Sequence, residues 1–266
     1  RNQLNTLGFV SLNYPTIDLK NYIDNTDRPT TFSNMKHYFS KKNKDFEICS
    51  HRTNSIARFI RFNAILNCME IDVIIENDYL DVRHSTGDTI SLKLIDLIDI
   101  QKDKKNILWL DVKKVENNNQ CNKFLNILNN IYSKDNNINL LIEFPSEIIN
   151  KISLYNKCIL NIKSMNFPIS FYIPNDIKLK CTKEKEQDLS NQNDCQYLDE
   201  LLKKIYESNL FTDLSFDYKN YHLLKHSKYI DYFILNTWHI PDDEIVLIND
   251  QKFRLIIPFN DNINYN

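Results

Sequence analysis

The feature that most constrains the fold is a regular alternation of strand-like and helix-like segments that begins near residue 46. Short runs of apolar and β-branched residues alternate with segments whose apolar residues recur every three to four positions. Eight strands are predicted, at residues 46–51, 69–75, 107–115, 139–144, 169–173, 214–218, 232–238 and 253–259. Helices are predicted between most of them, at residues 56–66, 91–101, 122–133, 147–155, 196–208 and 221–228. This α/β pattern favours a closed (β/α)8 barrel of the TIM type over an open sheet, somewhat irregular because a last helix is hard to find.

The first 45 residues do not share this pattern. They are polar, contain Pro15 and Pro29, and hold one predicted helix at residues 32–41. We expect residues 1–45 to be an N-terminal extension packed on the barrel and residues 46–266 to be the barrel itself. The chain opens on Arg1 rather than Met, so we expect that a segment such as a signal peptide or membrane anchor has been removed upstream.

The composition excludes several classes of function. The net charge of −2 argues against a protein that binds nucleic acid by neutralising phosphates. The chain has two glycines, which excludes glycine-rich phosphate loops of the Walker or dinucleotide type. No apolar run approaches the roughly 20 residues that a membrane-spanning helix needs. A peripheral contact with a membrane stays open, and no protein partner is evident from the sequence.

The six cysteines show no CxxC pair and no zinc-finger spacing, so a structural zinc is not expected. Cys49 and Cys68 lie in apolar strand patterns and are interpreted as small core residues. Cys181 and Cys195 flank a polar run at residues 182–194, and whether they form a disulfide is open at this stage. The even number of cysteines favours an extracytoplasmic location, whether periplasmic, secreted or membrane-anchored, over a cytoplasmic one.

Two carboxylates lie on the most apolar of the predicted strands. Because side chains alternate along a strand, Glu70 and Asp72 share one face while Ile71 and Val73 share the other. Burying two neighbouring carboxylates is costly unless a positive charge lies between them. The strand therefore predicts the floor of a cation site.

Polar and ionisable side chains recur at the ends of the other predicted strands. In a parallel barrel these ends meet at one rim, where alternate side chains point inward. The candidates are His51, His84, Asp111, Lys113, Glu143, Ser215, Asp217, Asn236 and Trp238. Such a concentration is typical of an active site and is avoided in a stability core.

The order and spacing of these residues resemble the phospholipase C-like phosphodiesterases. The resemblance rests on His51-Arg52, Glu70-x-Asp72, His84, Asp111-x-Lys113 and Trp238, and it covers residues 46 to 259. The His-Arg pair is similar to that of glycerophosphodiester phosphodiesterases, and Asp-x-Lys is closer to the sphingomyelinase D branch. Two positions depart from the pattern: Thr53 replaces the usual Gly, and Ser85 replaces the usual carboxylate. The resemblance implies a TIM-barrel phosphoric diester hydrolase that uses a divalent metal ion and takes a small-molecule or lipid phosphodiester as substrate.

The chemistry of the residues agrees with that implication. Glu70, Asp72 and Asp111 supply the hard oxygen ligands that Mg²⁺ or Ca²⁺ prefers. Arg52 and Lys113 add positive charge for a phosphate, Lys113 within the catalytic set and Arg52 in substrate binding.

The remaining polar and aromatic candidates receive separate roles. His51 and His84 can act as general acid and general base, with His84 preferred as the base. Trp238 is expected to form an apolar wall for the substrate. Glu143 is assigned to substrate binding, although it and Asp217 are also interpreted as residues that hold a neighbour in place.

Other interpretations stay beside these. The three carboxylates could instead form ion pairs with Lys113 and Arg52. Trp109 is interpreted as core packing. The histidines outside the proposed rim are interpreted as structural: His37, His222, His226 and His239.

Three functions remain open from the sequence. The first is a metal-dependent phosphodiesterase that cleaves a glycerol- or lipid-type phosphodiester by His/His acid–base catalysis. The second is a phospholipase D-like lyase that leaves a cyclic phosphate. The third is an inactive barrel that binds a phosphorylated glycan or lipid.

Overall fold

A computed structural model describes residues 46–64, 66–84, 91–101, 105–178, 180–181, 195–245 and 252–258. The predicted N-terminal extension, its helix at residues 32–41, and Ser85 lie outside these residues. The chain divides into two units between residues 42 and 43, and the described residues all lie in the second.

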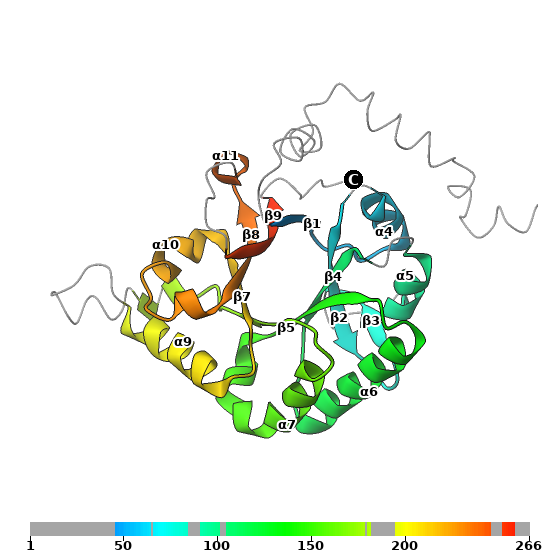
Figure 1. Cartoon of the computed structure of the whole chain (residues 1–266), viewed down its shortest axis with the longest axis horizontal. Coiled ribbons are helices and arrows are strands. Elements are labelled where there is room, and N and C mark those ends of the chain that lie inside the picture. Colours follow the sequence, from blue (N-terminus) through cyan, green and yellow to red (C-terminus); the bar gives the residue numbers. More distant parts are fainter. Residues whose placement is uncertain are drawn as a thin grey trace, which may run out of the picture. The chain divides into compact units, whose positions relative to one another are not determined.

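Eight parallel strands form a closed barrel (Figure 1). They are β1 (Glu47–Ser50), β2 (Cys68–Ile75), β4 (Ile107–Val112), β5 (Asn139–Phe144), β6 (Ile169–Tyr172), β7 (Asp213–Asp217), β8 (Ile234–Ile240) and β9 (Phe253–Pro258). Around the ring they follow the order β1-β9-β8-β7-β6-β5-β4-β2, and pairing of β1 with β2 closes it. All eight predicted strands are confirmed. The short strand β3 (Leu80–Val82), which the sequence did not reveal, pairs antiparallel with β2.

Helices surround the ring of strands in Figure 1. They are α4 (Ile56–Asn63), α5 (Leu94–Ile100), α6 (Asn118–Lys134), α7 (Ile152–Lys163), α9 (Gln196–Ser208), α10 (Tyr221–Leu224) and α11 (Asp242–Ile245). Short 3-10 segments are η2 (Ser146–Lys151), η3 (Tyr218–Asn220) and η4 (Ile230–Tyr232). None of the helices in this described part has both the length and the apolar character to cross a bilayer.

Local sequence explains where the long helices begin and what they bury. Asn117 caps α6 by accepting a hydrogen bond from the Gln120 backbone N–H at 3.0 Å. Cys121, Phe124 and Leu128 of α6 then recur on one face and are buried against the barrel. Helix α9 ends at Ser208 and is capped by Asn209, which adopts the left-handed conformation that asparagine tolerates better than most residues.

Two predicted helices differ from the observed ones. The helix predicted at residues 147–155 is a 3-10 segment, η2, followed by a longer helix, α7, because Pro145 forces an extended entry into the turn. The helix predicted at residues 221–228 is the single turn α10, and it ends after Leu224.

The inner face of the barrel carries two kinds of residue. Apolar side chains fill part of the interior as a cluster: Cys49, Cys68, Trp109, Leu141, Trp238, Leu255 and Ile257. Toward the carboxyl ends the inward positions become carboxylates. The interior is therefore a packed core below a polar mouth.

All six cysteines form disulfides: Cys49–Cys68, Cys121–Cys158 and Cys181–Cys195. Cys49 and Cys68 are core residues as predicted, but they also join β1 to β2. The link between Cys181 and Cys195, which the sequence left open, is present. Three disulfides favour an oxidising, extracytoplasmic compartment.

Candidate active site

Strand register brings the predicted carboxylates to the same end of the barrel. Asp72 of β2 pairs with Asp111 of β4, which in turn pairs with Glu143 of β5. Glu70 lies two residues before Asp72 and pairs with Trp109. The alternation of side chains expected from the sequence is therefore observed, and all of these side chains share the inner face.

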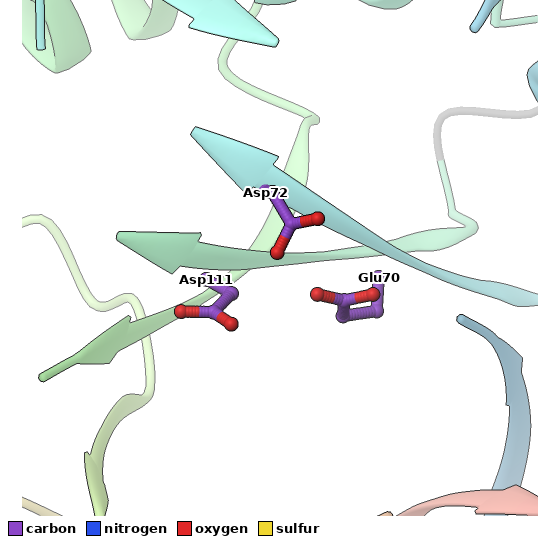
Figure 2. A group of neighbouring side chains, drawn as sticks. All are labelled: Glu70, Asp72 and Asp111. Atoms are coloured by element: carbon purple, nitrogen blue, oxygen red, sulfur yellow. The ribbon is translucent and has the colours of Figure 1, made fainter. Parts of the chain in front are cut away.

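Glu70, Asp72 and Asp111 converge from β2 and β4, with their carboxylates directed toward a common point (Figure 2). One oxygen from each lies within 4.8 Å of the others. Glu70 and Asp72 are fully buried. This is the spacing that a single cation needs in order to contact all three residues.

Neighbouring groups hold these carboxylates in place. The Arg52 backbone N–H donates to Glu70 Oε2, while the buried Glu70 Oε1 has no hydrogen-bond partner. Asn54 contacts Asp72 twice: its side-chain amide donates to Asp72 Oδ2, and its Oδ1 accepts from the Asp72 backbone N–H at 3.0 Å. Sequence reasoning missed Asn54, whose role is visible only once β1 and β2 are adjacent.

Lys113 provides the positive charge inside the carboxylate group. Its ammonium forms ion pairs with both Asp72 and Asp111. Burial opposes ionisation of Lys113, yet Asp111 and Asp72 raise its pKa above the ordinary lysine value. Burial likewise works against ionised Asp72, but Lys113 holds the pKa of that carboxyl below its usual range. These two groups therefore stay charged.

Lys113 compensates the charge of Glu70 only in part. Burial raises the pKa of Glu70 well above its ordinary value, and the charges of Asp72 and Asp111 raise it further. The Arg52 guanidinium does not form an ion pair that would neutralise Glu70, because it bonds to His84 instead. Three carboxylates, an unpartnered buried oxygen and an excess of negative charge fit a divalent cation such as Ca²⁺ or Mg²⁺.

The two predicted catalytic histidines lie at the same mouth in different settings. His51 follows β1, and burial together with nearby Arg52 lowers its pKa to about 3. His84 follows β3 and is half exposed. Its Nδ1 is 3.3 Å from Asp72 Oδ1, and its Nε2 is 3.1 Å from the Arg52 guanidinium. Because guanidinium can only donate, Nε2 accepts and Nδ1 carries the hydrogen toward Asp72.

A cavity of about 320 Å³ opens at this mouth. The predicted residues that line it are His51, Arg52, His84, Asp111, Lys113, Glu143 and Trp238. Further lining residues include Tyr172, Asn175, Asp217 and His239. A second cavity of about 690 Å³ adjoins the first and shares four of its lining residues, Ser146, Glu147, Tyr172 and Asn175.

An aromatic wall closes one side of the cavity. The rings of Trp238 and Trp109 are 4.7 Å apart between centroids, and Tyr172 meets Trp238 edge-on at 5.4 Å. The Trp109 indole N–H donates to Glu143 Oε2 at 3.0 Å. Burial, reinforced by the charge of Asp111, raises the pKa of Glu143 well above its usual value. Trp109 is thus core packing as predicted, and it also orients Glu143.

His239 lines the cavity, although the sequence suggested a structural role. Alternation along β8 assigns Asn236 and Trp238 to the inner face and His239 to the outer one. The pairing of β8 with β9 is irregular between Thr237 and Ile240, and His239 has φ of 58°, a left-handed conformation. This irregularity turns His239 into the mouth. Its position had no signal in the sequence.

No protein-family model matches the chain, and no curated protein matches it. It is similar to the solved structure of a calcium-dependent phosphoinositol-specific phospholipase C from a Gram-negative bacterium, Pseudomonas sp., with 14% sequence identity and a TM-score of 0.44, covering 81% of this chain and 89% of that chain. It is also similar to a chitinase from Chromobacterium violaceum, with 10% identity and a TM-score of 0.41, covering 74% of this chain and 68% of the other. The eight-stranded parallel barrel that the sequence predicts is established by the pairing of its strands.

Proposed function

We propose that this protein is a metal-dependent phosphodiesterase that acts on a glycerol- or lipid-type phosphodiester. The observation that carries the proposal is the meeting of three carboxylates, Glu70, Asp72 and Asp111, at the mouth where cationic and imidazole side chains also converge. Acidic residues alone would repel a phosphodiester. Cationic side chains alone would bind it without a site for a divalent ion.

The carboxylates would hold Ca²⁺ or Mg²⁺, and such an ion supplies charge neutralisation at a phosphoryl oxygen. Lys113 and Arg52 line the same cavity and bring further positive charge to the phosphate. His84 supports Arg52 through its hydrogen bond to the guanidinium. Together these side chains bind the anionic centre and fix its orientation.

His51 is the better candidate for the base, which reverses the preference drawn from the sequence. The reason is geometric: Asp72 and Arg52 engage both ring nitrogens of His84, whereas His51 lines the cavity as a neutral imidazole, the form that can accept a proton from a hydroxyl or water. His84 is the second histidine of the pair. It transfers a proton only if it leaves one of its partners, because Asp72 and Arg52 engage its two ring nitrogens.

The dimensions of the mouth favour a phosphate joined to a small polar group. The cavity of about 320 Å³ suits such a ligand, with Trp238 as an apolar wall beside it. The adjoining cavity has room for a larger substituent.

The test is a turnover screen with Ca²⁺ or Mg²⁺ against glycerophosphodiesters, lysophospholipids and p-nitrophenyl phosphodiesters. We expect turnover with added metal, none with a chelator, and a loss of about 100-fold or more in His51→Ala. His226→Ala is the matched control, since His226 is an exposed histidine that follows α10. Phosphorus NMR of the product would separate an open monoester from a cyclic phosphate. Binding without turnover, unaffected by His51→Ala, would refute the proposal and favour an inactive barrel.

A further inference from the structure

The mouth contains a second carboxylate–imidazole pair that the proposed function does not use. His239 Nδ1 is 3.1 Å from Asp217 Oδ2. Lys219 also bonds to Asp217, through its ammonium at 3.0 Å and its backbone N–H at 3.2 Å. Asp217 and His239 both line the main cavity beside His51.

The two carboxylate–imidazole pairs lie on opposite walls of the barrel. Asp217 ends β7, whereas Asp72, the partner of His84, lies on β2. In the ring order, β7 is four strands away from β2 in either direction. A phosphodiester bound over the mouth would therefore have one pair on each side.

The backbone at His239 has an unusual conformation. Its left-handed φ of 58° costs free energy in any residue with a β-carbon, and the irregular pairing of β8 with β9 occurs at the same point. Arg52, the residue after His51, has φ of 49°. Outliers of this kind concentrate where a side chain must be aimed at a site. A purely structural histidine at the rim would not require such a distortion.

His239 is also close enough to His51 to act on the same phosphate. The two imidazole centroids are 5.6 Å apart, with the rings edge to face. One phosphodiester can span this distance, because each hydrogen bond from a ring nitrogen to an oxygen covers about 3 Å. A base and an acid can therefore contact the same substrate.

We propose that His239, oriented by Asp217, is the general acid that protonates the leaving oxygen. The inference rests on the proposed function and deepens it. His51 accepts the proton of the nucleophilic O–H as its oxygen bonds to phosphorus. The bond from phosphorus to the leaving oxygen breaks, and that oxygen takes the proton from Nε2 of His239. Asp217 keeps the Nδ1 hydrogen bond and stabilises the imidazolium before transfer.

The electrostatics around Asp217 support this assignment. Partial burial opposes its ionisation, but the bonds from His239 and Lys219 hold the pKa of Asp217 below its usual range. The carboxylate is therefore ionised when the imidazolium needs it. His84, engaged by Asp72 and Arg52, is left to orient the guanidinium.

The experiment compares two leaving groups in the metal-loaded full chain. One substrate is an alkyl phosphodiester that the wild type cleaves. The other is its p-nitrophenyl counterpart, whose leaving phenolate departs without protonation. The variant is His239→Asn, because asparagine tolerates a left-handed backbone but cannot act as the acid. We expect kcat/KM to fall about 100-fold or more on the alkyl ester and less than about 5-fold on the aryl ester.

Asp217→Asn should show the same selectivity with a smaller loss, of about 10-fold on the alkyl ester. It provides a second measurement if His239→Asn folds poorly. His226→Asn should leave both rates unchanged. If the wild type is active and His239→Asn loses activity equally on the two esters, or loses none, the role of His239 is overturned while the proposed function stands. A wild type that cleaves neither ester would overturn the proposed function and this inference together.

Discussion

Replacing Glu70 with glutamine should stabilise the metal-free protein and abolish its response to metal. Glu70 is buried within 4.8 Å of Asp72 and Asp111, measured between ligand oxygens. Two unit charges at that distance repel by about 3.5 kcal/mol at an effective dielectric constant near 20. Attraction to Lys113 offsets one of the two repulsions.

The raised pKa of Glu70 relieves part of the remaining charge repulsion, because a proton can neutralise the carboxylate. We therefore expect Glu70→Gln to raise the free energy of unfolding by about 1–3 kcal/mol in chelator. The glutamine carbonyl can still accept the Arg52 backbone N–H, so this contact is kept. For a domain of this size the change corresponds to a rise in Tm of about 3–10 °C.

The assay is thermal unfolding at neutral pH in chelator and in Ca²⁺ or Mg²⁺. Metal at about 100 times its Kd should stabilise the wild type by about 2.7 kcal/mol, and Glu70→Gln should lose most of that gain. Glu207→Gln, on the exposed side of α9, is the matched control and should behave as wild type. A metal-free Tm below that of the wild type, or an undiminished metal response, would refute the reasoning.

Three more predictions concern the same barrel. On acidification toward pH 4.5, the stability advantage of Glu70→Gln over the wild type in chelator should shrink. Glu70 has a raised pKa, so the folded wild type binds a proton more tightly than the unfolded chain and gains stability as pH falls. A pH series of Tm values checks this, and a difference in Tm that does not change with pH would contradict it. The double variant Cys49→Ala/Cys68→Ala should lose about 3 kcal/mol in denaturant unfolding, since it frees a loop with a separation of 19 residues; an unchanged midpoint would show that the cross-link is unimportant. Lys113→Met should reduce kcat/KM about 100- to 1,000-fold while keeping the Tm response to Ca²⁺, because in the proposed function the ammonium binds the phosphate rather than the ion. Loss of both would instead assign Lys113 to the metal site.

The barrel was largely predictable because its strands are marked by composition as well as by period. Every residue of β2 is buried, and the corresponding sequence is a nearly continuous apolar run. The missed elements are those without such a pattern. Strand β3 has three residues, too few to display a period, and it exists because β2 extends beyond its parallel partners and offers an edge.

The carboxylates of the site were predictable for the same reason. Glu70, Asp72 and Asp111 follow strict alternation on strands whose register is regular. The position of His239 at the mouth was not predictable, because the direction of its side chain depends on an irregular pairing with β9 that the sequence of β8 does not encode. The contact of Asn54 with Asp72 likewise depends on a loop conformation outside any regular element.

The covalent link between β1 and β2 bears on how the ring is assembled. Cys49 and Cys68 are close in sequence, so they can be oxidised as soon as the first two barrel strands have been made. Strand β9, by contrast, lies between β8 and β1 and is the last of the described strands along the sequence. In a nascent molecule, β1 and β2 would thus already be joined by the disulfide while the last strands of the barrel are still being synthesised. The final strand then enters a gap whose far side is already fixed, which limits the ways in which an incomplete cylinder can pair with a neighbouring molecule.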